Sequence, residues 1–299
     1  MKIPVGRTIE GAFGFVFRNF LSVFGVIWFP YLVATAIIVG ATLWLVPDWR
    51  TVFDHVGNDP TTIVGPMMRL ARIFTVAWPV LLVVGAMVEV GLLRQALGLH
   101  KGQTLVYFSL GAPVWRMVGA LILVFFISLA IVLATALAAG LIIGLASTFV
   151  PSPGRWWIDG IVGAVAVIWA IYAVIRLRFF LPAVVVAEGE IGIGRAWHLA
   201  GGNVLRIIAI SLVIGISVSI VFGIISALFT PAIPFPMFAQ HGDPQMIWRW
   251  YSVVLHSVGP VLVAIRLVQI AFMAALGAGA VASAYRSLVP PAAAEGMHS

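Results

Sequence analysis

The chain has 299 residues, of which 62% are hydrophobic and only 9% charged, and its mean hydropathy is +1.13. A water-soluble core of this length does not need so much apolar surface, so the composition predicts that the lipid bilayer is the solvent. The chain carries 17 Lys and Arg against 10 acidic residues, a net charge of +7. Because the basic residues flank apolar segments, we attribute this excess to the positive-inside rule and not to nucleic-acid binding.

The N-terminal segment Met1–Phe20 does not have the pattern of a cleavable signal peptide, because no short apolar region precedes a small-residue cleavage site. Its apolar residues recur at helical spacing, opposite Arg7 and Arg18, which predicts an amphipathic helix at the membrane surface. Similar short segments, each with an aromatic residue six positions before a breaking or capping residue, precede two later spans (Tyr107/Pro113 and Trp197/Asn203).

Hydropathy predicts an all-α polytopic membrane protein with about six transmembrane helices, arranged in three helical hairpins with interfacial amphipathic helices. The predicted spans are Leu21–Val46, Ile73–Leu93, Met117–Phe149, Ile158–Ile175, Ile207–Phe229 and Leu267–Tyr285.

Pairs of arginines bracket one span of each hairpin, at similar separations. The pairs are Arg72/Arg94, Arg155/Arg178 and Arg266/Arg286, which are 22, 23 and 20 residues apart. A helix of that length is roughly 30–35 Å long, close to the hydrocarbon thickness of a bilayer. We therefore expect one membrane domain, residues 1–289, built from repeats at about 5–98, 99–187 and 188–287. Residues 290–299 are expected to be a disordered tail.

The distribution of Lys and Arg predicts the orientation, because eleven of them fall on one side of the predicted spans and six on the other. The richer side should be cytoplasmic. This places both termini in the cytoplasm and the protein in the inner membrane of a bacterium.

Two linked segments, Arg176–Gly189 and Ile193–Arg206, carry a basic span end, a Leu-Pro-Ala turn, an acidic-Gly pair and a Trp-bearing helix that ends at Gly-Asn. This pattern resembles the bacterial integral membrane domain associated with glycerophosphodiester phosphodiesterases and related inner-membrane proteins. The catalytic domain of that family is a separate soluble barrel, and no part of this chain is polar enough to form it. The resemblance therefore implies the membrane module without the hydrolase activity.

Glu89 is the strongest candidate for an intramembrane polar site, because it lies about 7.5 Å along the helix inside Arg94. It is expected to form an ion pair with Arg94, or with Arg176 or Arg178 of another hairpin. The alternative is a carboxylate that couples to a proton or cation. Arg266 is interpreted as an interfacial anchor, with Val253–Ile265 on the surface or re-entering the membrane. Gln269 could hydrogen-bond a neighbouring helix.

Basic residues beside the amphipathic segments are candidate contacts for anionic lipid headgroups. Small-residue faces, such as Ala275/Gly279/Ser283 and Ala130/Ala134/Ala138, favour close helix packing, within the chain or in a homo- or hetero-oligomer. The candidate headgroup contacts are Arg7, Arg18, Lys101, Arg116, Arg195 and Arg206.

The sequence lacks the usual catalytic motifs and contains no cysteine, which excludes thiolate nucleophiles and Cys-ligated metals. A metal could in principle be held by His55, Asp59, His241 and Asp243, but these are ordinary polar residues of predicted loops. We therefore expect no cofactor and no metal. The sequence favours a non-enzymatic role in membrane or envelope organisation, lipid contact or partner assembly. A transporter or channel for a small solute or lipid, with a pathway between the hairpins, is the main alternative, and an intramembrane enzyme ranks third.

Overall fold

The computed structural model describes residues 2–46, 61–100, 102, 104–149, 152–229 and 259–289. Within these ranges the chain is helical and has no strand, and six helices are long and apolar enough to cross a membrane. The predicted all-α, multi-pass architecture is therefore confirmed. The expected tail 290–299, Lys101 and the four residues of the metal hypothesis lie outside the described residues.

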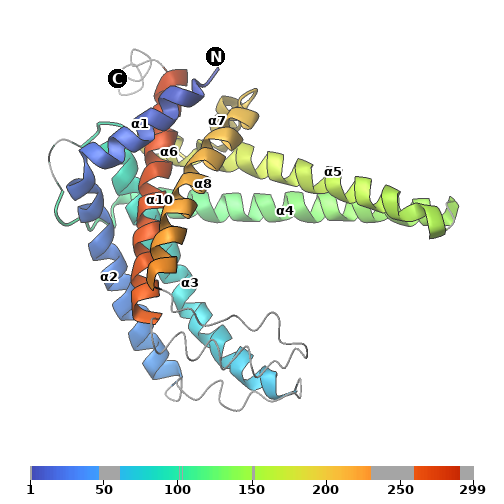
Figure 1. Cartoon of the computed structure of the whole chain (residues 1–299), viewed down its shortest axis with the longest axis horizontal. Helices are drawn as coiled ribbons and strands as arrows, with labels where there is room; N and C mark the ends of the chain where they lie inside the picture. The colour runs from blue at the N-terminus through green and yellow to red at the C-terminus, as the bar shows by residue number, and fades with distance from the viewer. Residues whose placement is uncertain are drawn as a thin grey trace.

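The long helices pack side by side in three pairs: α2 on α3, α4 on α5, and α8 on α10 (Figure 1). In each pair the second helix is the next long helix among the described residues. Three short helices, α1, α6 and α7, lie at the end of the molecule where α1 begins and α10 ends (Figure 1). The helices are α1 Val5–Arg18, α2 Phe20–Leu45, α3 Thr61–Ala96, α4 Ala112–Phe149, α5 Ser152–Arg178, α6 Leu181–Ala187, α7 Ile193–Ala200, α8 Val204–Phe229 and α10 Gly259–Leu288.

Local sequence determines where several of these helices begin and end. Asn19 alone separates α1 from α2, and its side-chain amide donates a hydrogen bond to the carbonyl of Phe15 at 3.0 Å, which satisfies an end carbonyl of α1. Pro113 and Pro182 stand in the first turns of α4 and α6, where a missing N–H costs nothing. Gly202 precedes α8 with a φ of 72°, a conformation that glycine adopts without strain.

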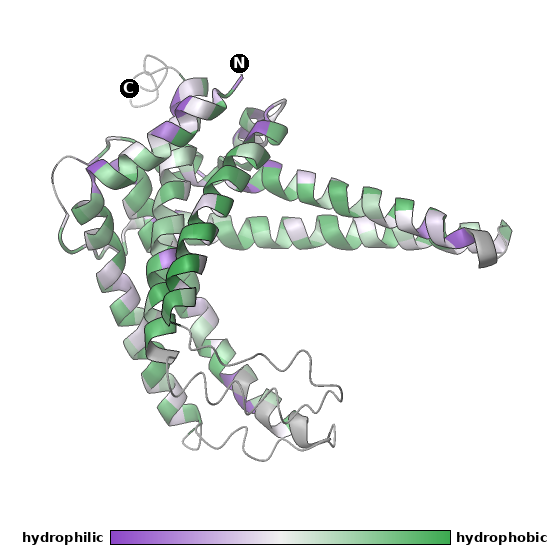
Figure 2. Cartoon of the chain, viewed as in Figure 1, coloured by the Kyte–Doolittle hydropathy of each residue, from purple (hydrophilic) through white to green (hydrophobic). Residues whose placement is uncertain are grey.

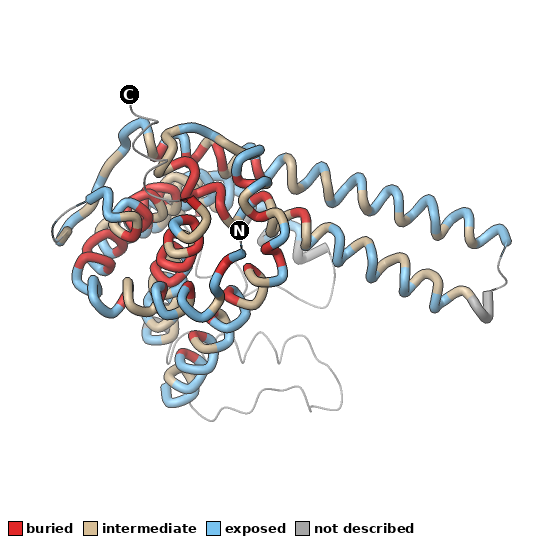
Figure 3. Tube along the Cα trace, turned by 90° about the horizontal axis from the view of Figure 1, so that it is seen from above, coloured by how far each residue is buried: buried red, intermediate tan, exposed pale blue. Residues whose placement is uncertain are grey.

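The α4–α5 hairpin extends sideways from a bundle formed by α2, α3, α8 and α10 (Figure 1). Beyond its base this arm is exposed along its length, whereas the buried residues gather in the body of the molecule (Figure 3). The exposed surface of the arm is apolar (Figure 2) and includes Phe126, Leu137 and Trp156. In a membrane, lipid chains cover such a surface.

The core lies where α1, α3, α6 and α10 meet. Ala12, Met87, Leu181 and Leu276 are each at most 1% exposed there. The amphipathic α1 crosses α10 closely, since a Cβ added to Gly279 would lie 3.0 Å from the Cα of Ala12. The predicted small-residue face Ala275/Gly279/Ser283 thus packs within the chain against α1. The stripe Ala130/Ala134/Ala138, in contrast, is exposed on the arm.

The segment before α4 differs from the expected interfacial helix. Residues 104–111 are not helical, and they lie against the first half of α2. The indole N–H of Trp28 donates to the carbonyl of Leu105 at 2.8 Å, and the backbone N–H of Thr104 donates to the Ser22 hydroxyl at 3.3 Å. Gly98, just after the last residue of α3, has a positive φ angle that ends this helix, and the positive φ angle of Gly102 favours an irregular connection.

Candidate functional site

A cavity of about 680 Å³, partly open to the surface of the molecule, lies between α2, α3, α8, α10, the α4 and α5 ends next to the bundle, and α6. We call it the central cavity. This volume is typical of a site for a small organic molecule. On α3 its wall runs from Leu81 to Leu93, about 18 Å along the helix axis. The cavity therefore occupies the half of the bundle next to Arg94 and Arg178, the half expected to face the cytoplasm.

The wall of this cavity is amphipathic. Four of its residues carry polar side chains, namely Tyr31, Glu89, Arg178 and Ser211, and the others are apolar or glycine. Glu89 and Arg178 lie toward the end of the cavity marked by Leu93, and the wall on α3 at the opposite end, near Leu81, is apolar.

The Glu89 carboxylate faces this cavity without a direct partner from the protein. The ion pairs of the described residues join Arg155 to Asp159 and Arg195 to Glu188, and neither involves Glu89. Arg178 is the basic residue that lines the cavity together with Glu89. The predicted ion pair of Glu89 with Arg94, Arg176 or Arg178 is therefore not found in the described part of the chain. Arg178 lines the same cavity, but its side-chain nitrogens are more than 4.0 Å from the Glu89 carboxylate.

Arg176 and Arg178 have different surroundings, because residues two positions apart on a helix point about 200° apart. Arg176 turns to α7, where its Nε donates to the carbonyl of Trp197 at 3.1 Å and its guanidinium stacks on that indole, 4.2 Å from the ring centroid. It also donates to the Tyr172 hydroxyl at 3.2 Å. Arg176 thus joins α5 to α7 and does not reach the cavity.

Gln269 also lies outside the cavity. Its side-chain oxygen accepts a hydrogen bond of 2.6 Å from Arg266, three residues earlier on α10. Met273, one turn further along the same helix, lines the cavity. Residues 259–265 form the first turns of α10 and continue directly into the apolar span, while residues 253–258 lie outside the described ranges. The structure therefore brings together two of the four predicted residues, Glu89 and Arg178.

Two of the arginines predicted to contact lipid headgroups are instead paired with other groups of the protein. Arg195 pairs with Glu188 at 3.3 Å, and Glu188 also accepts a 2.7 Å hydrogen bond from the hydroxyl of Tyr285. Arg206 donates to the carbonyl of Ile3 at 3.2 Å, which holds the N-terminal segment on α8.

Three other predicted headgroup contacts are exposed. Among the described residues, no hydrogen bond or ion pair to Arg7, Arg18 or Arg116 is found. Their guanidinium groups remain available to a lipid surface.

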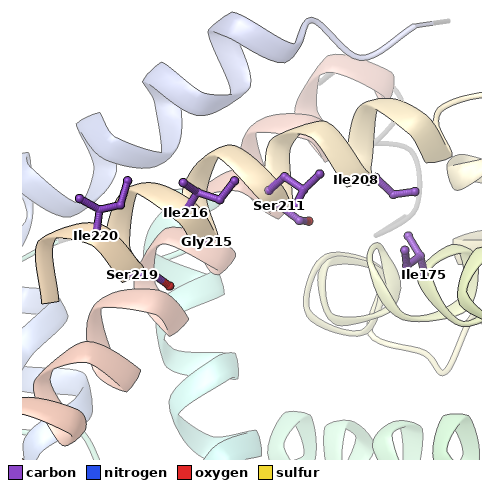
Figure 4. A pocket seen from close by; sticks show the side chains of 8 residues that line it. Ile175, Ile208, Ser211, Gly215, Ile216, Ser219 and Ile220 are labelled. Atoms are coloured by element: carbon purple, nitrogen blue, oxygen red, sulfur yellow. The ribbon is translucent and has the colours of Figure 1, made fainter. Parts of the chain in front are cut away.

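A second, shallower hollow of about 510 Å³ lies outside the bundle, between α8 and Ile175 at the end of α5 (Figure 4). Isoleucines line it together with Ser211, Gly215 and Ser219, which recur every fourth residue along α8. This spacing is typical of a helix-packing surface. The hollow contains no ionisable side chain, so the central cavity is the stronger candidate site.

Among the polar residues of the cavity wall, Tyr31 and Ser211 are the two that the sequence analysis did not single out. Each lies in an apolar span that also contains other serines or threonines, so the sequence offers little to distinguish it. Serines are common in apolar spans as packing residues, so their presence there is a weak signal.

No family model, no curated protein and no solved structure matches this chain. The protein is a multi-pass α-helical membrane protein by its fold. The resemblance to the membrane domain associated with glycerophosphodiester phosphodiesterases stays a prediction.

Proposed function

We propose that this protein is a non-enzymatic protein of the bacterial inner membrane, with both termini in the cytoplasm, and that its central cavity binds a membrane lipid. The observation that carries the proposal is the amphipathic wall of that cavity: one charged end, at Glu89 and Arg178, and a remainder that is apolar apart from Tyr31 and Ser211. A lipid in the cytoplasmic leaflet presents its headgroup and chains in the same order. Binding such a lipid would be the chemical basis of a role in membrane organisation.

A glycine in the cavity wall offers a direct test. A Cβ added to Gly277 would meet nothing within 4 Å, so Gly277→Leu fills part of the cavity without a clash at its base. Displacing about two methylene groups of a ligand chain, at ~0.8 kcal/mol each, should lower lipid affinity about tenfold. The measurement is the number of lipids retained per protein after purification in mild detergent, determined by native mass spectrometry.

Gly140→Leu is the matched control. Gly140 lies on the exposed arm, also with nothing within 4 Å of an added Cβ, so this variant makes the same change to a helix outside the cavity. The proposal predicts wild-type lipid retention for Gly140→Leu and reduced retention for Gly277→Leu. Equal retention in the two variants would rule the proposal out.

Transport of the bound molecule is the second candidate function, favoured by the carboxylate of Glu89 within a membrane cavity. It requires release on the opposite side of the membrane. Accelerated transfer of a fluorescent lipid between the leaflets of proteoliposomes, lost in Gly277→Leu, would support transport over static binding.

A further inference from the structure

We infer that the ligand of the central cavity is a zwitterionic aminophospholipid, whose ammonium group pairs with Glu89 and whose phosphate pairs with Arg178. This inference rests on the proposed lipid-binding function and specifies the headgroup. It follows from the charges that the protein leaves unpaired in the wall.

The first step is the isolation of Glu89. An ionised carboxylate in an apolar wall is unfavourable unless a cation or hydrogen-bond donors compensate it. The described residues provide no hydrogen bond or ion pair to this carboxylate. Glu188, which is 8% exposed at its side chain, shows the contrast, because Arg195 and Tyr285 both contact it. The Glu89 carboxylate is therefore available to a ligand that brings its own cation.

The second step is the charge balance of the site. Glu89 and Arg178 are the ionisable acid and base among the residues that line the cavity, Tyr31 aside, and their formal charges cancel. A headgroup with one ammonium and one phosphate matches both charges at once. A headgroup with a net negative charge, such as phosphatidylglycerol, would pair with Arg178 but bring no cation, so the charge of Glu89 would remain uncompensated in the apolar wall.

The third step is the separation of the two charges. Glu89 and Arg178 are in the same cavity but not within 4.0 Å of each other, so neither group consumes the hydrogen-bonding capacity of the other. A guanidinium is well suited to bind phosphate through two parallel N–H bonds. The ammonium of a primary amine provides three N–H donors for a carboxylate.

The test uses full-length protein reconstituted in nanodiscs that hold equal amounts of phosphatidylethanolamine and phosphatidylglycerol with identical acyl chains. The protein is then extracted, and the retained lipids are counted by native mass spectrometry. The wild type should retain phosphatidylethanolamine about tenfold over phosphatidylglycerol, the factor that one charge-assisted hydrogen bond contributes. Glu89→Gln should lower this ratio to about one, because it removes the charge but preserves the shape of the side chain.

Glu10→Gln is the matched control, since Glu10 is exposed and lies on α1, which contributes no residue to the cavity wall. It should keep the wild-type ratio. Arg178→Gln provides an independent second variant, which should lower the retention of both lipids because both carry a phosphate.

The outcomes separate the inference from the proposed function. If Gly277→Leu reduces lipid retention but the wild type already retains the two lipids at a ratio near one, the inference about the headgroup is overturned. The proposed lipid binding then still stands. A wild-type preference that survives Glu89→Gln would also overturn the inference about the headgroup. Lipid retention that Gly277→Leu does not change would overturn the proposed function itself.

Discussion

Glycine residues allow segments of this protein to pack closely against one another, and Gly25 is the clearest case. A Cβ at this position of α2 would overlap the carbonyl oxygen of Thr104, so only glycine admits the segment 104–111 at this distance. We predict that Gly25→Ala lowers the free energy of unfolding by about 1–3 kcal/mol, the usual cost of overpacking. The measurement is the thermal unfolding midpoint of the protein in detergent.

Gly14→Ala is the comparison for this prediction, because Gly14 is also helical but has nothing within 4 Å of an added Cβ. Alanine is the better helix former by roughly 0.5–1 kcal/mol, so this variant should unfold at or above the wild-type temperature. A Gly25→Ala protein as stable as Gly14→Ala would contradict the close contact between α2 and residues 104–111.

At the scale of the element, α1 combines a buried face, formed by Thr8, Ala12 and Val16, with an exposed basic face. Ala12 packs on α10, while Arg7, Arg18 and Phe17 are exposed. We predict that phosphatidylglycerol added in detergent raises the unfolding temperature of the wild type more than that of the Arg7→Gln/Arg18→Gln double variant. Each basic residue contributes about 1 kcal/mol to the attraction of anionic lipid.

Two further variants show whether the loss of the phosphatidylglycerol response comes from lost headgroup binding or from a damaged structure. Glu10→Gln, on the same helix, removes a negative charge and should leave the response to phosphatidylglycerol undiminished. Arg206→Gln should lower the unfolding temperature with or without lipid, because Arg206 holds the carbonyl of Ile3. A double variant that responds to phosphatidylglycerol as strongly as the wild type would show that α1 is a structural helix only.

At the scale of the whole molecule, the parts that could be predicted from the sequence are those that depend on local composition. The number and position of the spans follow from the length of each apolar run, and the close-packing face at Gly279 follows from the spacing of small residues. Glu89 stands out because a carboxylate is costly in an apolar span.

The remaining features depend on contacts between distant segments. Sequence spacing alone leaves Arg94, Arg176 and Arg178 as equal partners for Glu89, and only the rotation of α5 about its axis places Arg178 in the cavity and Arg176 on Trp197. The same limit applies to the direction of the α4–α5 arm and to residues 104–111, whose path is set by their contact with α2 (Figure 1).

The position of a bound lipid within the molecule tests the central claim most directly. A phospholipid with a photoreactive diazirine in its acyl chain can be crosslinked to the protein in nanodiscs, and the modified residues can be identified by peptide mass spectrometry. Lipid binding in the cavity predicts crosslinks on its apolar wall, at residues such as Leu81, Ile214 and Met273, that decrease in Gly277→Leu and persist in Gly140→Leu. Crosslinks confined to the exposed surface of the arm, or cavity crosslinks that Gly277→Leu leaves unchanged, would contradict it.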